Sequence, residues 1–248
     1  MTNELSGTTA LVTGATSGIG RATAVKLAKL GAHVLVGGRD ADRGEQVVKE
    51  IRADGGQAEF LAADLTDEAS ARDLAARAEA ITGHVDVLVN SAGIFPFGPT
   101  EATTEQDFDS VFALNVKAPY FLVAALAPKM AERGSGAIVN VSTMVAGFGA
   151  AGMALYGASK AALELLTKAW AAEFGPRGVR VNAVSPGPTR TEGTAVMGES
   201  LDQLASLAPA GRPGEAAEIA AAIVFLATGG AGFVQGAVLP VDGGRAAV

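Results

Sequence analysis

The stretch ALVTGATSGIGRATAVKLAKLG, residues 10–31, decides the fold of this 248-residue chain. It starts with an apolar run typical of a buried strand, turns through Gly14, Gly18 and Gly20, and continues as an amphipathic helix closed by Gly31. Glycines at such a turn let the backbone approach a pyrophosphate, whose charge is stabilised by the positive end of the following helix. The stretch therefore predicts a strand, loop and helix that bind a nucleotide, with an ordinary tight turn as the alternative.

Apolar runs alternate with helical ones along the rest of the chain. Further strands are expected within HVLVGG (33–38), AEFLAAD (58–64), VDVLVN (85–90), GAIVNVS (136–142), GVRVNAVSPG (178–187) and FVQGAVLPVDGG (233–244). Their near-continuous apolar character is typical of a parallel sheet buried on both faces. We expect one α/β domain over residues 1–248, a Rossmann-type doubly wound parallel sheet of about seven strands flanked by helices in three α/β/α layers.

Composition excludes several classes of function. The net charge of −7 argues against nucleic acid as a partner, because phosphate binding needs a basic face. The absence of cysteine excludes disulfides, thiolate catalysis and cysteine-ligated metals, and we expect no metal site. The polar start is no signal peptide, and the longest apolar run, residues 219–227, is far shorter than the ~20 residues of a membrane span. We expect a soluble cytoplasmic protein without a membrane partner.

The stretch ALYGASKAAL, residues 154–163, places Tyr156 four residues before Lys160 in a chain with only 2 tyrosines. On a helix these side chains lie on one face, one turn apart. Reduction of a ketone puts a proton on oxygen, and a phenol of pKa ~10 holds its proton too tightly for reversible transfer. An ammonium ~4 Å away supplies about 4 kcal/mol at an effective dielectric of ~20, enough to lower the pKa of the phenol. The pair predicts proton transfer; a core tyrosine beside a lysine paired with Glu164 is the alternative.

The motifs occur in the order found in the short-chain dehydrogenase/reductase family, which the chain resembles over essentially its whole length. After TGATSGIG, the matching segments are NSAG (90–93, with Ser91 in place of the second Asn), LNVKAP, IVNVST, Tyr156-x-x-x-Lys160, SPGPTRT and LPVDGG. The sequence is similar to 3-oxoacyl-carrier-protein reductases. The resemblance implies an NAD(P)(H)-dependent oxidoreductase that interconverts a ketone and a secondary alcohol.

The resemblance also implies a role for each matching residue. Tyr156 is the acid/base, Ser142 hydrogen-bonds the carbonyl, Lys160 also holds the nicotinamide ribose, and Asn115 anchors a water in a proton relay. The residues implied to contact the cofactor are Gly14, Thr16, Ser17, Gly18, Ile19, Gly20, Arg39, Asp64, Leu65, Asn90, Ala92, Gly93, Tyr156, Lys160, Pro186, Gly187, Thr189 and Thr191.

The end of the second strand favours NADP(H) over NAD(H). In dinucleotide folds an acid at this point binds the ribose 2′-hydroxyl, whereas an Arg nearby accepts a 2′-phosphate. Here Gly38 occupies the acid position and Arg39 follows it. NAD(H) remains possible, because Asp40 would reach the ribose if the strand bulged. The favoured interpretation of Asp40 is a helix N-cap.

The substrate pocket is expected to be apolar and uncharged. Phe95, Met144 and Phe148 follow the strands that end at the site, and a small lid is expected at about residues 188–212. These features predict a small apolar ketone or alcohol as substrate.

The sequence leaves two alternative functions open, and the resemblance implies an oligomeric state. The first alternative is a 3-oxoacyl-[acyl-carrier-protein] reductase of fatty-acid or polyketide synthesis. Ala172 stands where those enzymes often present an Arg to the carrier protein, although Lys129 and Arg177 could substitute. The alternative from another class is a non-catalytic dinucleotide-binding sensor or scaffold. The resemblance further implies a homotetramer built across the Tyr156 helix and the long helix before it.

Overall fold

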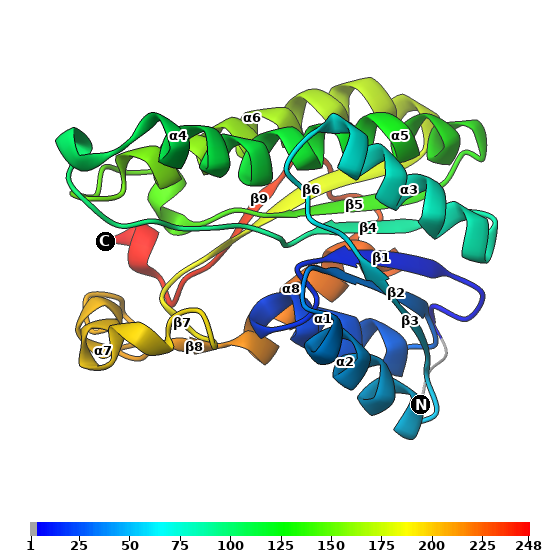
Figure 1. Cartoon of the computed structure of the whole chain (residues 1–248), viewed down its shortest axis with the longest axis horizontal. Helices are drawn as coiled ribbons and strands as arrows, with labels where there is room; N and C mark the ends of the chain where they lie inside the picture. The colour runs from blue at the N-terminus through cyan, green and yellow to red at the C-terminus, as the bar shows by residue number, and fades with distance from the viewer. Residues whose placement is uncertain (1–3) are drawn as a thin grey trace.

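Seven parallel strands form one sheet in the order β3-β2-β1-β4-β5-β6-β9 (Figure 1). This architecture comes from a computed structural model that describes residues 4–248. The strands are β1 (Thr9–Thr13), β2 (His33–Gly38), β3 (Gln57–Ala62), β4 (Val87–Asn90), β5 (Gly136–Val141), β6 (Val179–Pro186) and β9 (Val238–Val241). The predicted doubly wound parallel sheet is confirmed.

Helices cover both faces of the sheet and form the outer layers of a three-layer structure (Figure 1). One face carries α1 (Gly18–Lys29), α2 (Ala41–Ala53) and α8 (Ala216–Ala227), and the other carries α3 (Glu68–Thr82), α4 (Glu105–Phe112), α5 (Ala118–Glu132) and α6 (Ala154–Phe174). Alternate side chains of each strand point into one of two separate apolar cores, as in Leu11 on one side and Val12 on the other. The continuous apolar runs of the sequence follow from this double burial.

The strand order reverses between β1 and β4, and this point positions the site. The last residues of these strands, Thr13 and Asn90, lie side by side in the parallel register. The Thr13 hydroxyl accepts hydrogen bonds of 3.1 Å from the backbone N–H groups of Ser91 and Ala92, which joins the loops after the two strands. Open α/β sheets bind ligands in the crevice at such a switch point.

The long helix expected before the Tyr156 helix is interrupted. A π-helical segment, Ala113–Lys117, separates α4 from α5. The combined helix, Glu105–Glu132, is long and apolar enough to span a membrane, with a mean hydropathy of 1.5 over its most apolar window. Its apolar residues Leu122, Leu126 and Met130 are fully buried against the sheet and α3, so it is a core helix.

The chain between β6 and α8 stands beyond the carboxyl ends of the strands. It contains β7 (Thr189–Arg190), α7 (Glu199–Ala205) and β8 (Gly214–Glu215), and β7 pairs with β8 in a separate two-stranded sheet. This segment includes the predicted lid. At the sheet edge, the strand predicted within residues 233–244 is shorter than the run, because β9 pairs with only the last four residues of β6.

Candidate active site

A cavity of about 680 Å³ opens at the carboxyl ends of the parallel strands. It is lined by the loops after β1, β2, β4, β5 and β6, by the start of α6, and by the segment that contains α7. Most of the predicted site residues line this one cavity, including Phe95, Met144 and Phe148. Asp64, Asn90 and Asn115 do not line it.

The loop after β1 can be built only with glycine at two positions. Gly14 has a φ of +65°, and a Cβ added there would lie 2.8 Å from the Ala92 Cα. A Cβ on Gly20 would lie 2.2 Å from the Gly14 carbonyl oxygen. At these positions the loop lies close to the neighbouring backbone at the start of α1, and the N-terminal end of a helix suits a phosphate ligand. This geometry fits a dinucleotide.

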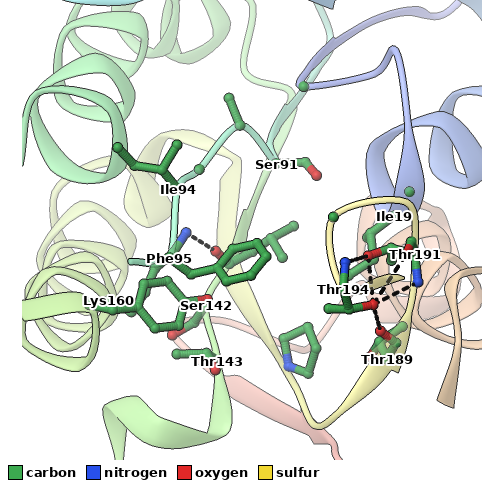
Figure 2. A pocket seen from close by; sticks show the side chains of 18 of the residues that line it. Ile19, Ser91, Ile94, Phe95, Ser142, Thr143, Lys160, Thr189, Thr191 and Thr194 are labelled. Carbon is green, nitrogen blue, oxygen red and sulfur yellow. Dashed lines mark hydrogen bonds between the residues drawn. The ribbon is translucent and has the colours of Figure 1, made fainter. Parts of the chain in front are cut away.

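The chain after β7 reaches back to the same loop. A carboxylate oxygen of Glu192 accepts a hydrogen bond of 2.8 Å from the Gly18 N–H, at the positive end of α1. Thr194 fastens this segment, because its hydroxyl bonds the Thr189 carbonyl at 2.7 Å and the Thr191 N–H at 3.0 Å (Figure 2). Sequence reasoning missed Glu192, since its contact spans 174 residues.

Two guanidinium groups line the cavity beyond β2. Asp40 is the N-cap of α2, as the favoured interpretation expected: its carboxylate accepts from the Arg43 N–H at 3.0 Å and from Arg43 Nε at 2.6 Å. Arg39 lies 3.8 Å from the Asp64 carboxylate, and both side chains are mostly exposed. Because its carboxylate caps α2, Asp40 is not free to bind the ribose 2′-hydroxyl.

Tyr156 and Lys160 lie one turn apart on α6, with Lys160 buried and Tyr156 partly buried. The Lys160 ammonium donates to the Val141 carbonyl at 2.7 Å (Figure 2). Burial lowers the pKa of Lys160 to about 8. Burial also raises the pKa of Tyr156, and a hydrogen bond with the Thr143 side chain acts in the opposite direction. The expected lowering of the phenol's pKa is therefore wrong for this structure, because desolvation of the phenolate outweighs the contacts that favour it.

The hydroxyls of Ser142 and Thr143 have different partners. Ser142 is buried at the end of β5, and its hydroxyl donates to the Glu164 carboxylate at 2.6 Å. The Thr143 side chain, in contrast, is within hydrogen-bonding reach of the Tyr156 phenol. Both side chains line the cavity, but the one that meets Tyr156 is Thr143. The hydrogen bond from Ser142 to the substrate carbonyl stays a prediction.

Asn115 and Asn90 lie next to the cavity without lining it, and their side chains hold the backbone around it in place. The fully buried Asn115 amide accepts from the Ile94 N–H at 3.0 Å and donates to the Ile94 carbonyl at 2.9 Å. These two bonds fix the loop after β4 beside Lys160. The Asn90 side-chain amide donates to the Asn140 amide oxygen at 2.8 Å, and the Oδ1 atom of Asn90 is buried without a hydrogen-bond partner among residues 4–248.

The far half of the cavity is apolar with one exception. The Phe95 ring packs against Tyr156, with ring centroids 6.1 Å apart. Phe97, Met144 and Phe148 lie farther along. Arg245, from the short helix after β9, also lines this half. Sequence reasoning missed it, because nothing local distinguishes an Arg after the DGG turn.

Comparison with known proteins agrees with this geometry. A family profile described as Enoyl-(Acyl carrier protein) reductase matches residues 14–246. The chain is 40% identical to the 2,5-dichloro-2,5-cyclohexadiene-1,4-diol dehydrogenase of Sphingobium indicum, over 98% of both chains. A solved short chain dehydrogenase/reductase family protein is 51% identical, with a TM-score of 0.92 over 99% of this chain and all of that one.

A structure of gluconate 5-dehydrogenase from Burkholderia cenocepacia in complex with NADP and tartrate is also similar. It is 32% identical, with a TM-score of 0.93 over 99% of this chain and 98% of that one. The sheet order, the glycine loop and these relatives together establish the type of protein. The chain belongs to the short-chain dehydrogenase/reductase family and is an oxidoreductase that acts on alcohol and ketone groups with NAD(P).

Proposed function

We propose that the chain interconverts small, largely apolar ketones and secondary alcohols, with NADP(H) as the preferred cofactor and Tyr156 as the acid/base. One observation carries the proposal. The partly buried phenol of Tyr156 and the buried ammonium of Lys160 line the same cavity as the glycine loop after β1. A proton donor and a dinucleotide cradle thus share one space, as carbonyl reduction requires.

The residues that would hold the cofactor surround the switch point. The loop after β1 would hold the pyrophosphate, Leu65 would contact the adenine side, and the loops after β4 and β6 would contact the nicotinamide half. Asp64 and Asn90 lie outside the cavity. Asp64 would act through its ion pair with Arg39, and Asn90 would act by holding the end of β4. Bound NADPH supplies the hydride that adds to the carbonyl carbon.

The proton for the carbonyl oxygen comes from Tyr156. The phenol of Tyr156 is protonated near neutral pH and so holds the proton that the carbonyl oxygen receives. Because burial raises the pKa of this phenol, the transfer depends on groups that stabilise the phenolate. The phenolate left after transfer is stabilised by the Lys160 ammonium, whose pKa of about 8 keeps most of it charged at pH 7. The Thr143 hydroxyl, whose interaction with the phenol acts to lower its pKa, would donate a hydrogen bond to the same oxygen. The alcohol oxidation runs these steps in reverse.

Two features favour NADP(H). A Cβ on Gly38 would lie 2.5 Å from Thr16 Cγ2, so an acidic side chain there would require Thr16 to move. Arg39 and Arg43 line the cavity where the ribose 2′-phosphate would lie, and forked guanidinium donors suit a phosphate. The relative from Burkholderia cenocepacia was solved with NADP.

A carrier-protein substrate is the weaker alternative. The two cations that would have to dock an acidic carrier are already engaged. Lys129 pairs with the Glu79 carboxylate at 2.6 Å, and the Arg177 guanidinium stacks over the Phe174 ring at 5.1 Å. A small molecule needs neither contact.

The segment 188–212 is proposed to close over the substrate as a lid of the single domain. Met197, Leu201, Leu204 and Leu207 face the cavity from this segment, while Leu207 is also 57% exposed. Closure over a bound substrate would remove this apolar surface from water.

The test is oxidation of NADPH or NADH with a panel of aliphatic and cyclic ketones. Tyr156→Phe removes the transferable proton and should lower kcat by at least ~10²-fold with little change in NADPH affinity. In the same assay, Arg39→Ala should raise the KM for NADPH far more than the KM for NADH. Full activity of Tyr156→Phe would refute the proton-transfer role, and equal effects of Arg39→Ala on both cofactors would refute the NADP(H) preference.

A further inference from the structure

Arg245 places one positive charge in the half of the cavity that receives the substrate. Five charged side chains line the cavity. Arg39, Asp40 and Arg43 follow β2, at the adenosine end, and Lys160 is buried beside β5. The remaining one, Arg245, lines the cavity together with Phe95, Met144 and Phe148.

A built turn holds Arg245 in this position. The carboxylate of Asp242, which is 8% exposed, accepts hydrogen bonds from the N–H groups of Gly244 at 2.8 Å and Ala246 at 2.9 Å. Gly243 and Gly244 have φ of +67° and +86°, as the tight turn requires. The turn is joined to the loop after β6 by a 3.1 Å bond from the Gly187 N–H to the Val241 carbonyl. Arg245 therefore sits on the same framework as the proposed nicotinamide site.

The guanidinium has few partners of its own. Its Cζ lies 5.2 Å from the centroid of the Phe148 ring, and its Nη1 donates to an oxygen of the terminal carboxylate of Val248 at 3.2 Å. A bound substrate anion would have to compete with this exposed carboxylate for that one donor. Among the residues that the structure describes, no acidic side chain pairs with Arg245 within 4.0 Å. A guanidinium stacked on an aromatic ring keeps its edge donors free for a planar anion.

We infer that Arg245 binds a carboxylate of the substrate, and that the natural substrates are oxo acids and hydroxy acids whose carboxylate is separated from the reacting carbon by an apolar chain. This inference rests on the proposed function and names its substrate class. Arg–carboxylate pairs are frequently bidentate, which fixes orientation as well as affinity. The apolar side chains between Tyr156 and Arg245 would then contact the chain that joins the two ends of the substrate.

The test compares each oxo acid with its methyl ester, beginning with 4-oxopentanoate and extending to longer chains. The wild-type protein should prefer the acid in kcat/KM, and Arg245→Gln should reduce the acid-to-ester ratio roughly 10–100-fold, mainly through KM. Arg245→Lys should restore part of the ratio. Arg177→Gln is the matched control, since Arg177 also stacks on a phenylalanine, at 5.1 Å, but does not line the cavity. It should keep the wild-type ratio.

A second measurement separates this inference from the proposed function. Binding of hexanoate and of hexanol to the protein with NADP⁺ is measured by calorimetry for wild type and Arg245→Gln. Hexanoate binding that is lost in the variant, without turnover of any ketone, would refute the proposed function and support the anion site. Equal turnover of acids and esters by the wild type, or a variant that weakens both to the same extent, would overturn the anion site and leave the proposed function standing.

Discussion

Ser142 and Thr143 are neighbours at the end of β5, yet they take different roles because successive residues of an extended chain point in opposite directions. Ser142 is turned to Glu164 on α6, and Thr143 to the Tyr156 phenol. Thr143→Ala should therefore lower kcat by roughly 10²-fold, whereas Thr143→Ser retains most activity. Ser142→Ala should keep kcat within about threefold and lose about 1 kcal/mol of stability, since the partly buried Glu164 carboxylate loses its donor.

Steady-state kinetics and urea unfolding of the three variants check this prediction. If Ser142→Ala loses activity while Thr143→Ala does not, the carbonyl contact belongs to Ser142.

Burial of Lys160 makes the stability of the folded protein depend on pH. Its pKa is lowered to about 8 by burial, from an ordinary value of 10.5. Below pH 8 the folded state holds a desolvated charge, which lowers the free energy of unfolding. Between about pH 8 and pH 10.5 the folded protein has released this proton while the unfolded chain still retains it. The free energy of unfolding therefore rises over this pH range. Wild type should thus gain stability relative to Lys160→Met between pH 7 and pH 10, by on the order of 2 kcal/mol.

Urea unfolding of both proteins at the two pH values measures this gain, and Lys160→Met should also lose turnover. Lys168→Met on the same helix is the control, because Lys168 is exposed and should show no such change. A stability difference between wild type and Lys160→Met that is independent of pH would contradict the burial of a charged Lys160.

The predictable part of the site is the part that depends on local geometry. Tyr156 and Lys160 share a face of α6 because they are four residues apart, and Gly14 and Gly20 follow from the strand–loop–helix pattern. Arg245 was not predictable, because it meets Phe148 across 97 residues of sequence through a turn that Asp242 builds. The direction of the Tyr156 pKa depends on burial, which no local pattern reveals.

At the scale of elements, the segment after β7 is in contact with the start of α1. The Glu192 carboxylate is bonded to the Gly18 N–H, at the helix end where a pyrophosphate would bind. A bound dinucleotide must compete with this negative charge. Glu192→Gln keeps a hydrogen-bond acceptor and removes the charge, so it should bind NADP(H) roughly 3–10-fold more tightly.

Titration of NADPH fluorescence measures this affinity. Glu199→Gln, an exposed carboxylate at the start of α7 in the same segment, should leave it unchanged. Weaker binding by Glu192→Gln would show that the carboxylate supports the cofactor loop instead of competing for it.

The elements themselves were predictable where burial is continuous. β2 spans His33–Gly38, the whole of the predicted run, because both of its faces are covered. The π-helical segment Ala113–Lys117 was not predictable, since it accompanies the hydrogen bonds of Asn115 with Ile94, 21 residues away in the sequence. Such a change of helical register depends on tertiary contacts and leaves no trace in the apolar periodicity.

At the scale of the whole molecule, α4, α5 and α6 form part of one outer layer (Figure 1). Large apolar side chains of these helices are exposed to solvent. Phe108 is 49% exposed, Tyr120 46% and Leu165 69%. A second copy of the chain packed on this layer would remove them from water, at about 1.5–3 kcal/mol for each side chain fully buried. This is the surface on which the predicted homotetramer would be built.

Light scattering should therefore give a mass near four times the 24.8 kDa of one chain. Leu165→Glu would bury a charge without a partner in that assembly, and it should reduce the mass to that of a dimer or monomer. Ile81→Glu is the matched control, because Ile81 is also an exposed apolar residue, 39% exposed, but lies at the end of α3. A monomeric wild-type protein would contradict the predicted homotetramer. A Leu165→Glu variant of unchanged mass would show that Leu165 lies outside the subunit interface.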